Sequence, residues 1–243
     1  MLGPIDFFGP QALMKGIEVH TPNLPGYGSQ PLPPGGVELT LEQQAAWIVA
    51  YLRSHIGRPA WLLGHSVGGA VAMLAARMAP DLVTAIISVE GNFTLGDAFW
   101  CQRIAPMRED EWAAEHARMQ SEQQAWLAKS GIEPTARRLE WAQTILHNQA
   151  AATVHAMAKA VVRETAVPGY LAAVRDVIHH GTQLHLLAGE RSCTGWDLPP
   201  WVRTAAASTV VLPGVGHMMM LEAPEQFCKA VASMMLPDGF SLS

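Results

Sequence analysis

The chain has 243 residues, of which 49% are hydrophobic and 15% are charged. This length fits a single large α/β domain, and the composition excludes a disordered chain. The formal net charge is −5 and no run of Lys or Arg occurs, so we expect neither nucleic acid nor a membrane surface as a partner.

The sequence carries no signal for export or metal binding. Apolar runs such as 82–89 end well before the roughly 18 residues that a membrane-spanning helix needs. The first ten residues lack the basic segment of a signal peptide, so we expect a cytoplasmic protein. Cys101, Cys193 and Cys228 have no C-x-x-C spacing, which predicts reduced thiols and no metal site.

The first elements are a short strand and a capped helix. Residues 17–21 predict a strand, which leads into a loop rich in proline and glycine at 22–28. Thr40 and Gln43 have the spacing of a capping box, so a helix is expected to begin there and to end at Gly57.

Strand and helix signals then alternate, with one long helical interruption. Strands are expected at 60–63, 83–89, 183–188 and 209–212, and helices at 70–78, within 198–207 and at 224–235. Alternation of this kind predicts a mostly parallel sheet flanked by helices on both faces. Residues 94–180 contain no convincing strand, so we expect a core made of 1–93 and 181–243 with a helical insertion between them.

The first chemical motif lies between a predicted strand and a predicted helix. Residues 64–68 read Gly-His-Ser-Val-Gly, which matches G-x-S-x-G, and this context is typical of a nucleophile on a sharp turn. Gly64 and Gly68 are expected to let the chain pass closely around a strained Ser66. A helix cap is the alternative interpretation of the same residues, but the context favours a nucleophile.

Three motifs in order resemble the α/β-hydrolase superfamily, in particular its lidded serine esterase, lactonase and thioesterase branch. They are Asn-Leu-Pro-Gly-Tyr-Gly-Ser at 23–29, Gly-His-Ser-Val-Gly-Gly at 64–69, and the segment 214–224, which begins Gly-Val-Gly-His. The resemblance covers nearly the whole chain. It implies an α/β-hydrolase fold, a lid formed by 94–180, and no cofactor.

A serine nucleophile requires a base, and histidine has a suitable pKa. Among ten histidines, the resemblance places the base at His217, between a glycine-rich turn and the last helix. His65 is expected to pack beside the nucleophile turn and to contact substrate. The histidines in or beside the insertion are expected at the surface or along the lid.

The third group of the triad should be a carboxylate that orients the histidine. In many relatives it follows the penultimate strand, but Ser192 occupies that position here. Other members of the superfamily that the chain resembles, notably the haloalkane dehalogenases, can carry the acid after the strand that follows the nucleophile helix. We therefore prefer Glu90, which ends that strand here. Asp197 is the first reserve and Glu190 the second, and a carboxylate bonded to nearby backbone is the structural alternative for Glu90.

The resemblance also implies an oxyanion hole with two donors. The Val67 N–H is one candidate, and Leu2 is a candidate for the other. In the family, a strand and a His-Gly turn come before the loop that supplies the second donor. This sequence has no counterpart of either, so the N-terminal strands of the fold are expected to be absent. One lost donor typically costs about 100- to 1,000-fold in rate.

The expected function is hydrolysis of a small to medium uncharged ester, lactone or acyl thioester by an acyl-enzyme route. Phe93, Trp100, Met218 and Met219 are candidate substrate contacts. The expected partner is a small apolar molecule, and the protein is expected to be a monomer or homodimer. The alternative is a binding protein with little or no catalysis, because the N-terminal strands are missing.

Overall fold

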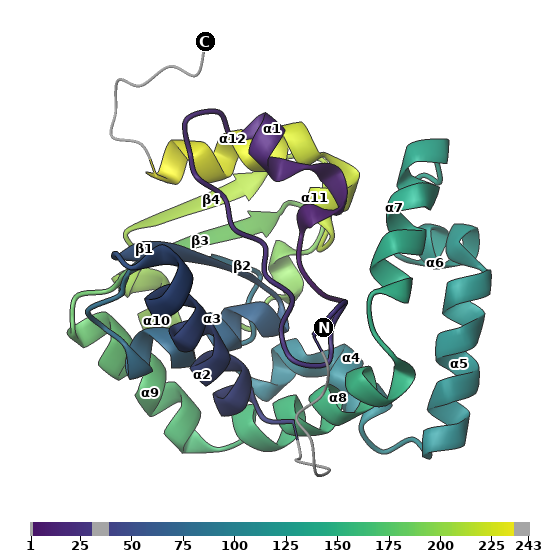
Figure 1. Cartoon of the computed structure of the whole chain (residues 1–243), viewed down its shortest axis with the longest axis horizontal. Coiled ribbons are helices and arrows are strands. Elements are labelled where there is room, and N and C mark those ends of the chain that lie inside the picture. The colour runs from purple at the N-terminus through teal and green to yellow at the C-terminus, as the bar shows by residue number, and fades with distance from the viewer. Residues whose placement is uncertain (1, 31–38, 236–243) are drawn as a thin grey trace.

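The computed structural model describes residues 2–30 and 39–235, and its centre is a parallel sheet. The strands lie in the order β1-β2-β3-β4 (Figure 1) and span Ala60–His65, Val83–Val89, Gln183–Gly189 and Ser208–Leu212. Because all strands are parallel, their carboxyl ends meet at one edge of the sheet. This edge holds the ends of β1, β2 and β3, from which the candidate residues continue.

Helices cover both faces of the sheet (Figure 1). One face carries the short α1 (Pro10–Leu13) and the C-terminal α12 (Pro224–Met235), and the other carries α2 (Leu41–Tyr51), α3 (Val67–Met78) and α9 (Pro168–His179). Shorter helices complete the core: η1 (Asp6–Phe8), η2 (Leu52–Ile56), η4 (Cys193–Gly195), α10 (Pro200–Ala205) and α11 (Met219–Glu222).

The regular elements of the segment between β2 and β3 are all helices, joined by short turns. Its other helices are η3 (Leu95–Ala98), α4 (Phe99–Ile104), α5 (Glu109–Ser121), α6 (Gln123–Lys129), α7 (Ala136–His147) and α8 (Ala151–Thr165). Helices α5, α6 and α7 lie to one side of the sheet (Figure 1), and α4 and α8 pack against each other. Helix α9, the last of this segment, packs against α3 and so belongs to the layer that covers the sheet.

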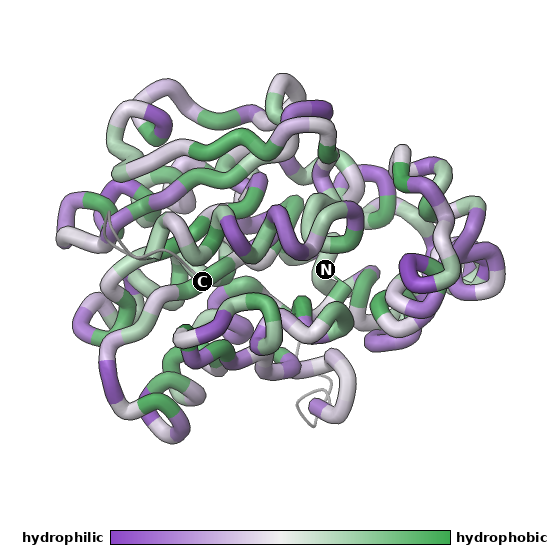
Figure 2. The backbone as a smooth tube through the Cα atoms, turned by 90° about the horizontal axis from the view of Figure 1, so that it is seen from above, coloured by the Kyte–Doolittle hydropathy of each residue, from purple (hydrophilic) through white to green (hydrophobic). Residues whose placement is uncertain are grey.

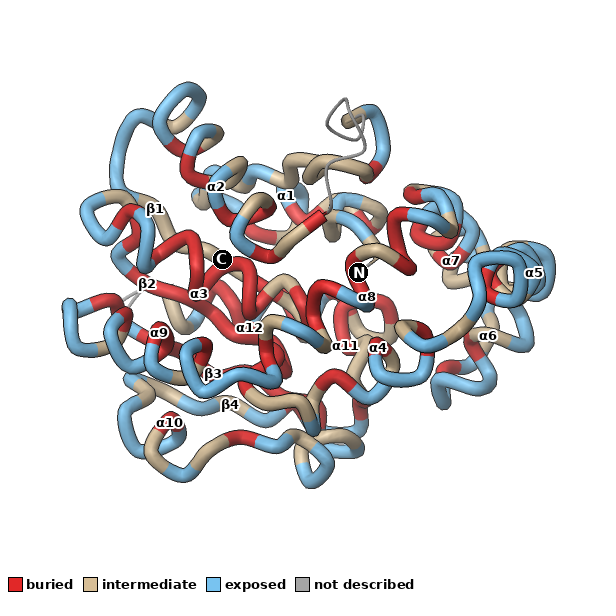
Figure 3. The backbone as a smooth tube through the Cα atoms, turned by 90° about the horizontal axis from the view of Figure 1, so that it is seen from below, coloured by how far each residue is buried: buried red, intermediate tan, exposed pale blue. Residues whose placement is uncertain are grey.

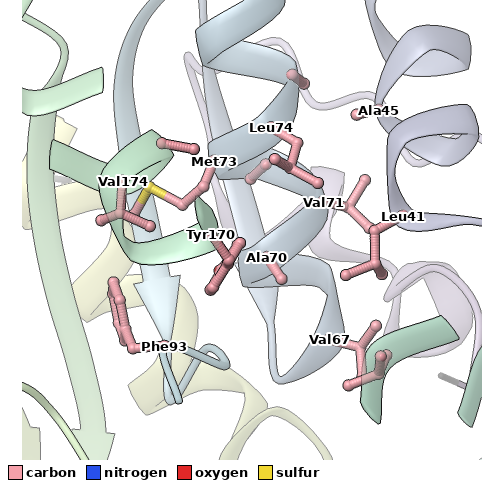
Figure 4. Packing of buried hydrophobic residues seen from close by; sticks show 14 of the residues in the cluster. Leu41, Ala45, Val67, Ala70, Val71, Met73, Leu74, Phe93, Tyr170 and Val174 are labelled. Carbon is pink, nitrogen blue, oxygen red and sulfur yellow. The ribbon is translucent and has the colours of Figure 1, made fainter. Parts of the chain in front are cut away.

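The core is built where β2, α3 and α9 meet. Every residue of β2 except Thr84 is buried, and Met73 on α3 packs near Val174 and Tyr170 on α9 (Figure 4). Small residues fill much of α3, which lets the helix lie close to the sheet. Buried segments run through the sheet layers (Figure 3), and hydrophilic ones are frequent on the outlying α5–α7 side (Figure 2). The core therefore fixes the sheet edge that carries the candidate site.

Most predicted elements are confirmed. Thr40 and Gln43 form both hydrogen bonds of a capping box, and Gly57 ends the helical stretch in a left-handed conformation. All four strands expected after residue 57 are present, each within two residues of its predicted bounds.

The strand predicted at 17–21 is wrong. Ile17 and Val19 pack against the cluster that contains Trp61 and Leu63, but the segment makes no strand ladder. Residues 17–21 and β1 both line the cavity, and no backbone hydrogen bonds join the two segments into a ladder. Residues 2–30 accordingly contain no strand, and β1 forms an edge of the sheet.

Three further features bear on the functional class. Among the described residues, no helix combines the length and apolar character that crossing a membrane requires. The same part of the chain holds no cluster of His, Cys, Asp and Glu suited to a metal ion. None of the three cysteines forms a disulfide, and burial raises the pKa of Cys101 and of Cys228 to about 11. Cys193 differs from the other two because it is partly exposed.

Candidate active site

Ser66 occupies the sharp turn between β1 and α3. Its backbone has φ +52° and ψ −122°, an unusual conformation for a residue with a side chain. The turn is fixed by the Ser66 N–H, which donates to Val89 (3.0 Å), and by the Ser66 carbonyl, which accepts from Gly69 (2.9 Å) and Asn92 (3.1 Å). The surrounding chain thus holds Ser66 in the strained geometry expected of G-x-S-x-G.

The glycines around Ser66 have different roles. A Cβ atom on Gly64 would lie 2.2 Å from the Gly68 carbonyl oxygen, and one on Gly69 would lie 2.7 Å from the Cα of Gly91. A Cβ atom on Gly68 would meet nothing within 4 Å. The backbones of Gly64 and Gly68 do approach closely, but a side chain is excluded only at Gly64 and not at Gly68. Gly69 is a second position without room for a side chain, which the motif did not indicate.

Glu90 lies directly after β2 with φ +40°, and its side chain is 4% exposed. Its Oε2 atom accepts a hydrogen bond from His217 Nδ1 at 2.6 Å. Its Oε1 atom accepts from the Gly189 N–H at 2.8 Å and from the Ser192 hydroxyl at 2.6 Å. Burial opposes ionisation, but hydrogen bonds from His217, Ser192 and Gly189 outweigh it and hold the pKa of Glu90 below its ordinary value.

The contact with Glu90 fixes the protonation pattern of His217. An ionised carboxylate only accepts hydrogen bonds, so the neutral imidazole carries its proton on Nδ1 and a lone pair on Nε2. Ser66 and His217 line the same cavity. Within the described part of the chain, the Ser66 hydroxyl makes no hydrogen bond to His217, whose side-chain hydrogen bond is to Glu90.

His65 supports the loop that carries His217. Its Nε2 atom donates to the backbone carbonyl of His217 at 2.9 Å, and the two rings lie 4.5 Å apart. Desolvation, and then the charge that His217 would carry, lower the pKa of His65 well below its usual range. His65 is therefore a neutral donor at pH 7. It packs beside the nucleophile turn as predicted, and it also lines the cavity.

The two reserve carboxylates make other contacts. Asp197 is exposed, accepts from the Thr94 hydroxyl and donates its own N–H to Asp97. Glu190 accepts from the Gly214 N–H at 2.7 Å. Of the three candidate carboxylates, Glu90 is the one that contacts His217.

The sequence analysis did not indicate the ion pair that secures the His217 loop. Arg191 Nη2 lies 2.5 and 2.6 Å from the two carboxylate oxygens of Glu222, and Glu222 accepts from the Gly216 N–H at 2.9 Å. The insertion adds two contacts, because Arg191 donates to the Gly131 carbonyl (3.2 Å) and Arg138 donates to the Glu222 carbonyl (2.7 Å). The His217 loop is thus tied to the α6–α7 region.

A cavity of about 1090 Å³ contains the candidate site. Trp100 and Met218, both predicted as substrate contacts, line it, as does Leu2. Phe99 also lines it: the residue is 66% exposed and its ring centroid lies 6.4 Å from that of His217. Sequence reasoning missed Phe99, because no pattern distinguished it from its neighbour Trp100.

Two of the predicted substrate contacts do not line the cavity. Phe93 is 1% exposed and packs with Trp196, their ring centroids 6.0 Å apart (Phe93 is shown in Figure 4). Met219 is fully buried in the cluster that contains Phe227. Their positions next to the candidate catalytic segments predicted contact with substrate, but both side chains are buried in the core.

Comparison with known proteins agrees with this architecture. The sequence model of the alpha/beta hydrolase family matches residues 3–230. No curated protein shows significant sequence similarity to this chain. Among solved structures, MenH from S. aureus is similar with a TM-score of 0.67 and 16% identity, covering 97% of this chain and 90% of that one.

Two esterase structures are also similar. A thermophilic esterase from Thermogutta terrifontis has a TM-score of 0.60 and 21% identity, covering 88% of this chain and 78% of that one. A structure from work on carboxylesterases of Nitrososphaera gargenis has a TM-score of 0.63 and 15% identity, covering 88% and 77%. At these identities the likeness concerns the fold, and it is the sequence model, matching nearly the whole length, that identifies the family. The chain belongs to the alpha/beta hydrolase family.

Proposed function

We propose that the protein is a serine hydrolase that cleaves a small to medium uncharged ester, lactone or acyl thioester. The observation that carries the proposal is the 2.6 Å hydrogen bond from His217 Nδ1 to the buried Glu90, which leaves His217 Nε2 available as a base in the cavity that Ser66 lines. Membership of the alpha/beta hydrolase family supports hydrolysis as the reaction class.

In the proposed mechanism Ser66 attacks the acyl carbon while His217 Nε2 accepts the hydroxyl proton. Glu90 keeps the imidazole in the required tautomer and stabilises its protonated form. The proton then passes to the leaving group, and water, activated by the same imidazole, releases the acid and regenerates Ser66. The Val67 N–H lies in the first turn of α3, where amides have no partner within the helix, and it is the proposed oxyanion donor, with Leu2 as the candidate for the second.

The composition of the cavity supports an uncharged substrate. Arg103 lines the cavity, but both of its terminal nitrogens are engaged by Glu115. Arg58, at another part of the same cavity, is paired with Glu18. Arg103 and Arg58 are thus each paired with a carboxylate, and aromatic and methionine side chains also line the cavity. We further propose that the helices of residues 94–180 act as the lid of this cavity and select the substrate.

Fluorophosphonate labelling of the full chain tests the proposal directly, because the reagent phosphonylates a serine that is activated by a base. We expect rapid labelling that peptide mapping assigns to Ser66 and that Ser66→Ala abolishes. A panel of p-nitrophenyl esters, lactones and acyl thioesters then defines the substrate class. Labelling elsewhere, or a folded protein that neither labels nor hydrolyses any of the panel, would contradict the proposal.

A binding function is the second candidate, since the Ser66 hydroxyl is not hydrogen-bonded to His217 in the described chain. A binder would show a rise in melting temperature with an ester that chromatography recovers intact. Conversion of the same ester to acid and alcohol, lost in Ser66→Ala, would exclude this candidate.

A further inference from the structure

The carboxylate of Glu90 has its two oxygens committed to different tasks. Oε2 faces His217, whereas Oε1 is held by the Gly189 N–H and the Ser192 hydroxyl, at 2.8 and 2.6 Å. Of the three partners of Glu90, His217 donates from a ring and Gly189 from the backbone. Ser192 donates from a short, neutral side chain. The same hydroxyl also lies 3.3 Å from the Gly189 carbonyl oxygen, so a single substitution removes both of these side-chain contacts and leaves the Gly189 N–H in place.

A carboxylate on a glutamate stem rotates about three side-chain bonds unless its oxygens are held. Glu90 is 4% exposed, so water does not replace a lost donor readily. With the Ser192 hydroxyl in place, Oε1 accepts from two donors, which restrict rotation of the carboxylate while Oε2 accepts from His217 Nδ1. Without it, the backbone N–H of Gly189 would be the one remaining donor observed at Oε1.

We propose that Ser192 is a positioning residue that orients the Glu90 carboxylate toward His217 and keeps it ionised in a buried place. This inference rests on the proposed function, in which Glu90 orients the base. Ser192 does not contact the reacting atoms; it acts through Glu90. Its hydroxyl proton stays on Ser192 throughout, as a hydrogen-bond donor.

The sharpest test compares Ser192→Val with Ser192→Thr. Valine and threonine have nearly the same shape, but only threonine carries a hydroxyl group. We expect Ser192→Val to lower kcat about 10-fold with KM nearly unchanged, since the lost contact serves the transition state. Ser192→Thr should recover most of the loss. Ser192→Ala gives a second variant without the hydroxyl and with less steric disturbance.

Two readouts separate positioning from a general effect on the fold. In Ser192→Val the titration of the Glu90 carboxylate, followed by carbon NMR, should move to higher pH, because the charged form of Glu90 has lost a donor and its pKa rises. His217 is the titratable group that faces Glu90, and Gly189 contributes a neutral backbone donor. Proton NMR of the His217 Nδ1–H should show a low-field resonance in the wild type and in Ser192→Thr, and a displaced or exchange-broadened one in Ser192→Val.

A matched control is Ser233→Ala on α12, whose hydroxyl donates to the Ala230 carbonyl at 2.8 Å and makes no contact with the site. It should leave kcat, the titration of Glu90 and the His217 NMR resonance as in the wild type. If Ser192→Val and Ser192→Thr agree in kcat and in the NMR resonance, Ser192 does not position Glu90.

The NMR readout needs no substrate, so the two proposals fail differently. A wild type without Ser66 labelling or hydrolysis, but with a low-field resonance that depends on the hydroxyl at position 192, would overturn the proposed function and keep the contact. An active wild type whose resonance ignores that hydroxyl would overturn the role of Ser192 alone.

Discussion

Gly64 and Gly68 approach so closely that a Cβ atom on Gly64 would lie 2.2 Å from the Gly68 carbonyl oxygen, with a further backbone atom of Gly68 at 2.4 Å. Gly64→Ala must therefore displace the start of α3 and the strained Ser66 turn. We expect it to lower the free energy of unfolding and to abolish fluorophosphonate labelling. Gly68→Ala is the matched control, because its added methyl group meets nothing within 4 Å, and its labelling should stay close to that of the wild type.

The choice of acid predicts opposite outcomes at two carboxylates. Glu90→Gln keeps the shape of the side chain but loses the charge that stabilises protonated His217, so kcat should fall by about 1,000- to 10,000-fold. Asp197→Asn should leave kcat nearly unchanged, since Asp197 contacts Thr94 and Asp97 rather than His217. Steady-state kinetics on one ester measures both, and the reverse pattern would assign the acid to Asp197.

His65 predicts a dependence of stability on pH. Its pKa is lowered in the folded protein, so the unfolded chain binds more protons once the pH falls below the ordinary value near 6.5. The free energy of unfolding should be greatest above that pH and should decrease as the pH falls toward 5. Urea titrations from pH 5 to 8 measure this slope.

His65→Gln should make that slope shallower without removing it, because burial also lowers the pKa of His116 and His185. Replacing the exposed His180 by Gln is the control and should leave the slope unchanged. An unaltered slope in His65→Gln would show that His65 does not resist protonation in the folded protein.

Phe93 and Met218 should differ in what their truncation changes. Phe93→Ala removes a fully buried ring and should lower the free energy of unfolding by about 3–5 kcal/mol. Met218→Ala, at the cavity wall, should alter KM and the preference among acyl chains with a much smaller loss of stability. Chemical denaturation and a kinetic series of esters of increasing chain length check the pair, and a selectivity change in Phe93→Ala with full stability would contradict it.

The sequence predicted the sheet well because its interior strands are continuous apolar runs. The residues at 83–89 and 183–188 are short, continuous apolar runs that have to be buried on both faces. In a chain of this composition, an interior strand of a parallel sheet is the structure that such runs favour. The segment at 17–21 has similar residues, but a strand also requires an edge to pair with. That requirement depends on parts of the chain distant in sequence, so local pattern could not decide it.

The candidate site was predictable where one turn or one strand end fixes a residue. Ser66 and Glu90 follow directly from strand ends, and the spacing between them brings both to one edge of the sheet. The contact of Ser192 with Glu90 joins residues 102 positions apart, and its detection needs coordinates. Phe93 and Phe99 show the same limit, because only six positions separate them in the sequence. Phe93 faces the core, whereas Phe99 faces the cavity.

The Arg191–Glu222 pair has a consequence for any attempt to exchange the helical insertion. Gly131 and Arg138 belong to the insertion, yet they bond to the two residues that hold the His217 loop. A chimaera with a foreign insertion would thus change the support of the base together with the walls of the cavity. If the proposed function holds, we expect substrate selectivity and turnover to change together. A transplant that retains a glycine carbonyl at position 131 and an arginine at position 138 should keep more of the original rate than one that lacks them.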